Sequence, residues 1–157
     1  GDRMLENLFP LWCALLSNVV AQVSKPFFYY YRTGKFDIRY TIACGGFPSS
    51  HTSTVTALTL AVGIAEGFSS TYFQIAAIFS FIVIYDAVNV RYYAGKNIQL
   101  TKQLVNDLAD MIKLPLDDPI YHERMKDVLG HRLVEAVGGF VVGVVVPVVA
   151  TMMMGYL

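Results

Sequence analysis

Residues 133–157, LVEAVGGFVVGVVVPVVATMMMGYL, form an apolar run in which Glu135 is the only charged residue. A bilayer core about 30 Å thick is crossed by roughly 20 apolar helical residues, so this run is long enough to span a membrane. The whole chain is biased in the same way: 55% of its residues are hydrophobic and 15% are charged, against about 25% charged residues in a typical soluble domain. The composition therefore predicts a membrane protein.

Three earlier segments have a similar character. They cover residues 8–31, 48–66 and 71–90. The second is rich in Thr, Ala and Gly, which favours a helix packed inside a bundle, and only residues 67–70, GFSS, separate it from the third. We expect a single all-α domain over residues 1–157, an integral membrane helical bundle of about four transmembrane helices.

Residues 98–114, IQLTKQLVNDLADMIKL, have a different pattern, in which apolar side chains recur with the 3.6-residue period of a helix. This pattern predicts an amphipathic interfacial helix that lies at the membrane surface or covers the polar end of the bundle. A plain solvent-exposed connector is the alternative.

The cations are divided unevenly between the two sides of this bundle. If each apolar segment spans once, every lysine and arginine except Arg3 lies on one side. An excess of Lys and Arg in short loops marks the cytoplasmic side of a membrane protein. We therefore predict that the cation-rich side faces the cytoplasm and that both termini lie outside. The net charge of zero gives no indication of nucleic-acid binding.

On the same side, residues 44–51, CGGFPSSH, lead into the second apolar segment. The two glycines let the backbone approach a ligand closely, and Pro-Ser-Ser is a favourable helix start. N–H groups at a helix N-terminus, with hydroxyls beside them, can bind an anion; a helix cap after a tight turn is the alternative. The candidate residues here are Gly45, Gly46, Ser49, Ser50 and His51.

Two further clusters face this side. His131 and Glu135 lie four residues apart and share one face of the predicted last helix. The carboxylate can accept a hydrogen bond from one imidazole nitrogen and leave the other as a base or nucleophile. Lys25 and Arg32 share a face of the first helix, and Arg39 follows in the loop. The alternatives are a surface pair and cations that merely extend to the lipid headgroups.

The third apolar segment ends in YDAVNVR, residues 85–91. Asp86 lies in or near the membrane, where an ion pair with Arg91 or another cation would neutralise it and could position a phosphate-binding group. Histidines, carboxylates and cations at one end of four helices suit phosphoryl transfer from a phosphomonoester. Serine–histidine–aspartate chemistry fits less well, because no serine lies in a nucleophile elbow, and no HExxH motif or cysteine ligand supports a zinc site.

Three motifs, GGFPSSH at residues 45–51, YDAVNVRYYAGK at 85–96 and LGHRLVEAVGG at 129–139, together resemble the divergent PAP2 family. The family consists of bacterial and plastid membrane proteins related to acid phosphatases and vanadium-dependent haloperoxidases. The resemblance extends over residues 11–146 and implies a PAP2-like helical fold.

The wider PAP2 superfamily has three motifs, KxxxxxxRP, PSGH and SRxxxxxHxxxD. In this chain Thr33 replaces the proline of KxxxxxxRP, and Ser50 replaces the glycine of PSGH. In SRxxxxxHxxxD, Glu135 replaces the aspartate and Met125 replaces the arginine. Arg39 or Arg91 could supply that charge. The resemblance implies no metal or other cofactor. It implies phosphate binding by Lys25, Arg32, Ser49 and Ser50, a general acid in His51, a nucleophile in His131 that forms a phosphohistidine, and orientation of that nucleophile by Glu135.

We therefore expect a multi-pass protein of a bacterial inner membrane or a plastid membrane that hydrolyses a lipid phosphate or pyrophosphate, such as a polyprenyl or glycerolipid phosphate. A lipid-phosphate binding or transport protein is the alternative; a haloperoxidase and a purely structural protein are others. Gly138, Gly139 and Gly143 allow close helix contacts, either inside the chain or in a homodimer through helix 133–157. An incomplete site wall favours the homodimer.

Overall fold

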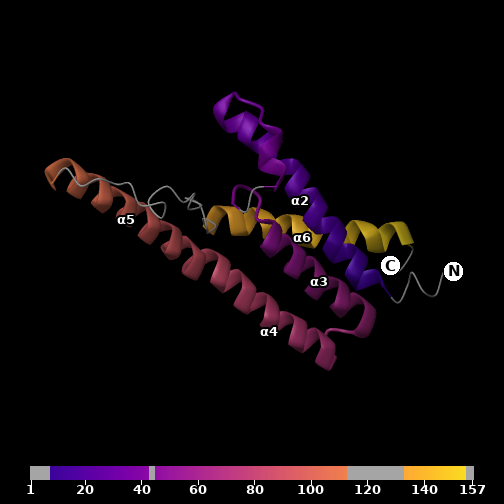
Figure 1. Ribbon diagram of the computed structural model, residues 1–157. Coiled ribbons are helices and arrows are strands. Elements are labelled where there is room, and N and C mark those ends of the chain that lie inside the picture. Colours follow the sequence, from indigo (N-terminus) through magenta and orange to yellow (C-terminus); the bar gives the residue numbers. More distant parts are fainter. Residues whose placement is uncertain (1–7, 43–44, 113–132, 155–157) are drawn as a thin grey trace.

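A computed structural model describes residues 8–42, 45–112 and 133–154, and in these ranges the chain is helical without β-strands (Figure 1). The four predicted apolar helices are all found. They are α2 (Phe9–Thr33), α3 (Ser50–Glu66), α4 (Thr71–Tyr85) and α6 (Leu133–Met154). The remaining elements are a 3₁₀-helix η1 (Ile38–Ile42), a π-helical segment η2 (Asp86–Val90) and α5 (Arg91–Ile112).

Local sequence explains where these helices begin and end. Ser49 and Ser70 are the N-caps of α3 and α4, and their hydroxyl oxygens accept hydrogen bonds from Thr52 N at 3.3 Å and Phe73 N at 3.2 Å. Helix α2 ends at Gly34, whose φ of +69° is the left-handed conformation of a common helix stop.

The predicted boundary at Val90 is wrong, because the helix does not end there. Segment η2 carries α4 directly into α5, and the two helices form one long rod (Figure 1). Residues 86–97 become polar but contain no proline, so nothing interrupts the ladder of backbone hydrogen bonds. The amphipathic helix predicted over 98–114 is therefore the continuation of α4, and α5 begins earlier, at Arg91.

Helix α3 lies in the middle of the bundle and packs against α2, α4 and α6 (Figure 1). The hydroxyls of Ser17 and Ser53 are hydrogen-bonded at 2.6 Å, and Cys13 packs near Ala61. Because an earlier residue of α2 meets a later residue of α3, the two helices are antiparallel. A hydrogen bond of 2.6 Å between the hydroxyls of Thr59 and Ser80 also joins α3 to α4. Cys13 is buried in this contact, as expected for a packing cysteine.

The interior of the bundle is made of small residues and the exterior of large apolar ones. Ala21, Ala57, Ser49 and Ser53 are completely buried. In contrast, side chains such as Phe27, Ile78 and Val134 are more than 60% exposed. Small residues allow close helix contact within a bilayer, where the lipid tails solvate the large apolar groups. This distribution is that of a bundle whose outer surface faces lipid.

Two stretches in the described part of the chain are long and apolar enough to cross a membrane. They are residues Thr71–Leu108, which run through α4 and α5, and Leu133–Met154, which form α6. The first has 38 residues, about 57 Å of helix, nearly twice the thickness of a bilayer core. Much of α5 therefore projects beyond a membrane that α4 crosses.

The glycines of α6 lie against α3. A Cβ atom at Gly139 would collide with the carbonyl oxygen of Ser49, and one at Gly143 would lie 2.6 Å from Thr56 Cβ and 2.7 Å from Ser53 O. All three predicted contact glycines, Gly138 included, are buried inside the chain. A homodimer through helix 133–157 would have to use the opposite, exposed face of α6.

Candidate functional site

The PSSH motif at residues 48–51 and the first turn of α6, which carries Glu135, meet where α3 and α6 begin. Ser49 N donates a hydrogen bond to the backbone oxygen of Glu135 at 2.8 Å. The ring of Phe47 covers Gly138, where a Cβ atom would collide with it. Residues 86 positions apart in the chain are thereby joined through their backbones. The loop before α3 and the first turn of α6 are therefore in direct contact.

The loop before α3 is shaped by glycine and anchored by an aromatic ring. Gly46 has a φ of +95°, a conformation that other residues rarely adopt. Gly45 is buried, and the Phe47–Pro48 peptide is cis. Phe47 packs edge-to-face on Phe28 of α2, with ring centroids 4.7 Å apart. The positive φ of Gly46 therefore sets the path of the loop toward α2 and α6.

Lys25 is the charged side chain most deeply buried in the described part of the bundle, with 1% of its surface exposed. It follows Ala21, which is fully buried on the α2 face that Ser17 turns to Ser53. Phe28, one turn further, reaches Phe47. Lys25 thus lies at the level of the loop that leads into α3. A lysine is rarely buried this deeply, and its burial makes Lys25 a candidate functional residue.

The predicted site residues at the starts of α3 and α6 differ in exposure. Ser49 and Ser50 are buried, with 0% and 2% of their surfaces exposed. His51 is exposed and Glu135 is half-buried. Asp86 is half-buried in η2, which packs against the end of α4 and touches α6. A single turn of π-helix within an α-helix is often found at a functional site.

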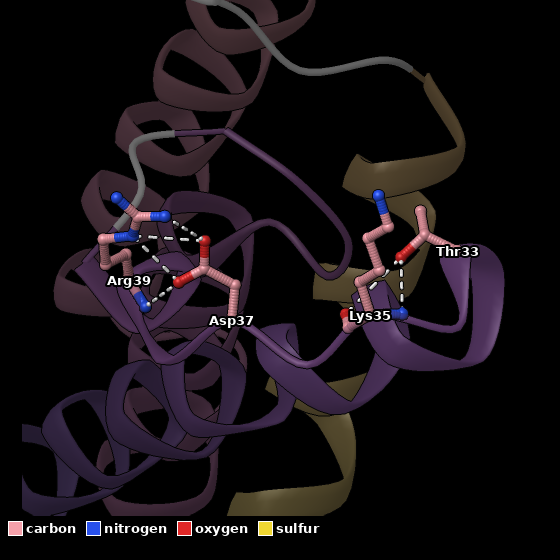
Figure 2. A network of polar contacts seen from close by, with 4 residues as sticks. All are labelled: Thr33, Lys35, Asp37 and Arg39. Carbon is pink, nitrogen blue, oxygen red and sulfur yellow. Dashed lines mark hydrogen bonds and ion pairs between the residues drawn. The ribbon is translucent and has the colours of Figure 1, made fainter.

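Two cations of the predicted site lie away from the buried cluster. Arg32 is exposed in the last turn of α2, seven residues or about 10 Å of helix beyond Lys25. Arg39 forms a 3.0 Å ion pair with Asp37 (Figure 2), and its side chain is 85% exposed. The structure therefore brings Lys25, Ser49, Ser50 and Glu135 to one end of the bundle but leaves Arg39 held by its own loop.

The loop that carries Arg39 folds back on α2. Tyr40 stacks on Tyr29 with ring centroids 3.9 Å apart. Thr33, which stands where the superfamily has proline, donates its hydroxyl to Tyr29 O at 2.8 Å and accepts from Lys35 N at 3.3 Å (Figure 2). Thr33 is therefore the last residue of α2 and begins the turn. Its hydroxyl fixes the turn by hydrogen bonds, whereas a proline would restrict the backbone through its ring.

We predict that Asp37 titrates below its ordinary range. Side-chain and then backbone hydrogen bonds from Arg39 lower the pKa of Asp37 below 3.8. A lowered pKa means that this contact stabilises the loop above pH about 4 and is lost as the pH falls through the folded-state value. In a carboxyl NMR titration, Arg39→Gln should raise the midpoint of Asp37 toward its ordinary value, because the side-chain hydrogen bonds from Arg39, the largest cause of the lowered pKa, are lost. A midpoint that Arg39→Gln leaves unchanged would contradict the pairing.

Two predicted site residues cannot be placed beside these. His131 lies outside the described residues, and Arg91 begins α5 with a side chain that is outside them as well. Within residues 8–42, 45–112 and 133–154, no three His, Cys, Asp or Glu side chains gather closely enough to hold a metal ion.

Sequence reasoning missed two polar residues of the interior. Gln22 Oε1 and Thr52 Oγ1 are buried, and neither atom has a hydrogen-bond partner among the residues that the structure describes. Gln22 is an amide inside an apolar run three residues before Lys25, a position at which a polar side chain is costly unless it has a use. That signal was readable in the sequence, whereas the burial of Thr52 depends on the packing of α3 against α6.

A lipid-facing bundle with a buried lysine and a backbone junction between its polar motifs defines a helical membrane protein with a candidate anion site. The model of the Divergent PAP2 family matches residues 6–146, and the chain belongs to this family. The membership predicted from the three motifs is confirmed.

One relative that the chain matches over most of its length is the "Uncharacterized membrane protein YuiD" of Bacillus subtilis (strain 168). It is 33% identical over 152 residues, which cover 94% of this chain and 96% of the relative. No solved structure matches the chain.

Proposed function

We propose that this protein is a multi-pass membrane phosphatase with four transmembrane helices and a PAP2-like bundle, acting on a lipid phosphate or pyrophosphate through a phosphohistidine. The observation that carries the proposal is the buried Lys25 at the level of the loop before α3, where Ser49 is hydrogen-bonded to the backbone of Glu135. A cation, two buried serines and a helix start are thereby gathered at one end of the bundle.

These groups suit the binding of a phosphate. A helix N-terminus favours an anion through its dipole and its N–H groups, and a buried ammonium group stabilises charge far better than an exposed one does. A lipid tail can lie against the large apolar side chains of the outer surface while its phosphate reaches the polar end. This arrangement supports a lipid phosphate as the substrate class, and a polyprenyl or glycerolipid phosphate is the expected form.

The family membership supports a two-step reaction. An imidazole nitrogen of His131 attacks phosphorus, the bond between phosphorus and the lipid oxygen breaks, and His51 donates a proton to the departing alkoxide. Water then gives a proton to His51 and attacks the phosphohistidine, so that the bond between phosphorus and nitrogen breaks, inorganic phosphate is released and both histidines are restored. Glu135 follows His131 by four residues, the spacing at which two side chains of one helix share a face, and we assign it the role of orienting the imidazole.

A lipid-phosphate binding or transport protein is the second candidate function. Two observations favour it: Met125 stands where the superfamily has its third-motif arginine, and Arg39, a possible substitute, is paired with Asp37. Fewer cations on the phosphate would weaken stabilisation of the transition state more than binding of the ground state. Such a protein would hold the lipid phosphate but release little phosphate.

Membrane placement and assembly are further parts of the proposal. The cation distribution favours a site that opens to the cytoplasm. The exposed face of α6 that includes Phe140 and Val141 remains available for a homodimer, because the opposite glycine face already packs on α3.

Lys25→Met provides the test of the buried cation. The purified protein in detergent should release phosphate from a panel of lipid phosphates and pyrophosphates, and Lys25→Met should lower kcat/KM by about 100-fold or more because a buried charge on the phosphate is lost. Lys35→Met, which removes an exposed lysine, is the matched control and should retain activity. Release that persists within about threefold in Lys25→Met would overturn the assigned site, whereas binding without any release would favour the second candidate.

A further inference from the structure

The amide of Gln22 has an acceptor that nothing in the described part of the protein satisfies. Its Oε1 atom is buried and has no hydrogen-bond partner. Nearby polar side chains are satisfied: Asn18 donates its amide to Thr54 Oγ1 at 2.8 Å, and Ser24 donates its hydroxyl to Ala21 O at 2.9 Å. Because buried polar groups are normally paired, an exception calls for an explanation such as an absent ligand.

The position of Gln22 places this acceptor at the candidate site. Asn18, Gln22 and Lys25 are spaced by four and three residues and so share one face of α2. That face is turned to α3, since Asn18 contacts Thr54. Helix α3 runs antiparallel to α2, so one turn after Asn18 corresponds to one turn before Thr54. Gln22 therefore lies at the level of Ser50, the first residue of α3.

A second unsatisfied atom marks the same turn. Thr52 is 1% exposed, and its Oγ1 lacks a hydrogen-bond partner in the described part of the chain. Threonine in a helix commonly donates to the carbonyl four residues earlier, as Thr54 does to Ser50 O at 2.7 Å. The first turn of α3 thus carries one orphaned hydroxyl and faces one orphaned amide oxygen, close to the level of Lys25.

The chemistry of the two unsatisfied oxygens, together with the positive charge of Lys25, restricts the ligand that the site can bind. A lysine ammonium group is a donor and requires acceptor oxygens, whereas an amide oxygen is only an acceptor and requires a donor. A fully ionised phosphate or a sulfate offers acceptors alone. A phosphate group that retains one proton offers both, with P–O⁻ oxygens for Lys25 and a P–OH for Gln22.

We propose that Gln22 is a specificity-determining residue of the phosphate site, and that its Oε1 accepts a hydrogen bond from the P–OH of a monoprotonated phosphate. The site then binds the monoanion of a phosphomonoester in preference to its dianion and to the corresponding sulfate ester. The inference rests on the proposed phosphate site, but it concerns binding, so its test does not depend on turnover.

The test compares hexyl phosphate with hexyl sulfate as ligands of the full-length protein in a non-ionic detergent, by isothermal titration calorimetry. Wild-type protein should bind the phosphate at least tenfold more tightly than the sulfate at about pH 5.5. Its affinity should fall as the pH rises past the second ionisation of the phosphate, near pH 6 for phosphomonoesters. Equal affinity for the two esters in the wild type would overturn the proposal.

Gln22→Met keeps the length of the side chain but removes the acceptor. We expect its preference for phosphate over sulfate to fall to about threefold or less and its pH dependence to flatten. Gln22→Glu retains an acceptor oxygen and should keep the preference for phosphate, even if both esters bind more weakly. Ser24→Ala, next to the site but already internally paired, is the control and should behave as the wild type.

The outcomes separate this inference from the proposed function. An undiminished preference in a Gln22→Met protein that unfolds at the wild-type temperature would overturn the role of Gln22 and leave the phosphatase intact. The expected preference without phosphate release from any lipid would support Gln22 and reject hydrolysis. Binding of neither ester by the wild type would reject the phosphate site and this inference together.

Discussion

Replacement of His131 by alanine is expected to abolish phosphate release while leaving lipid phosphate bound. In the proposed reaction the imidazole forms the bond to phosphorus, and no other group in the site replaces it. Loss of a covalent nucleophile should lower kcat by at least about 10³-fold. The Kd for the lipid phosphate should change by less than about tenfold, because Lys25, Ser49 and Ser50 still bind the ground state.

The measurement needs both readouts on the same preparation. Phosphate release reports catalysis, and titration with a non-hydrolysed phosphonate analogue of the lipid reports binding. His122→Ala is the matched control, because His122 belongs to none of the three motifs and should be dispensable. A phosphohistidine trapped from wild-type protein but not from His131→Ala would support the mechanism. Unchanged turnover in His131→Ala would reject it.

The second large effect is expected on folding, when Gly139 is replaced by leucine. A Cβ atom at this position would meet the carbonyl oxygen of Ser49 and lie 3.0 Å from Thr52 Cβ. Backbone atoms of α3 cannot move aside as a flexible side chain can, so α6 would have to separate from α3. We expect a loss of about 3 kcal/mol or more in the free energy of unfolding, and a fall in Tm on the order of 10 °C.

The control for this variant lies on the other side of the same helix. Val141 is 53% exposed, so Val141→Leu should leave Tm within about 2 °C, as surface substitutions usually do. Thermal unfolding followed by circular dichroism in detergent gives both values. A Gly139→Leu protein as stable as wild type would show that α6 does not pack on α3 through this glycine. Loss of stability in Val141→Leu as well would indicate that the outer face is also covered, as in a homodimer.

The sequence supported the prediction of all four apolar helices, for a reason that is local. Each is a run of apolar residues bounded by a cap or a turn, as at Ser49, Ser70 and Gly34. The boundary at Val90 failed because it was inferred from polarity alone. A helix can leave an apolar environment without ending, and only a residue that breaks the hydrogen-bond ladder would have stopped it.

The candidate site was predictable in part. Lys25, Ser49 and Ser50 were singled out by the motifs, and the structure buries all three. Arg39 was grouped with them by charge, although Asp37, two residues earlier, holds it at 3.0 Å. Gln22 was overlooked although an amide in an apolar run is a signal in the sequence, and the structure shows its oxygen buried without a partner in the described part of the chain.

By itself the sequence determined that the chain is a helical membrane protein with its polar motifs at one end, because hydropathy and helix capping act over a few residues. Tertiary structure alone decided that Gly139 and Gly143 meet α3 rather than a second copy of the chain, and that the Oε1 atom of Gln22 is buried. The physical reason is that in lipid all apolar faces are nearly equivalent. Helix partners are therefore selected by the fit of small residues and by hydroxyl contacts such as Ser17–Ser53, which depend on where distant parts of the chain come to lie.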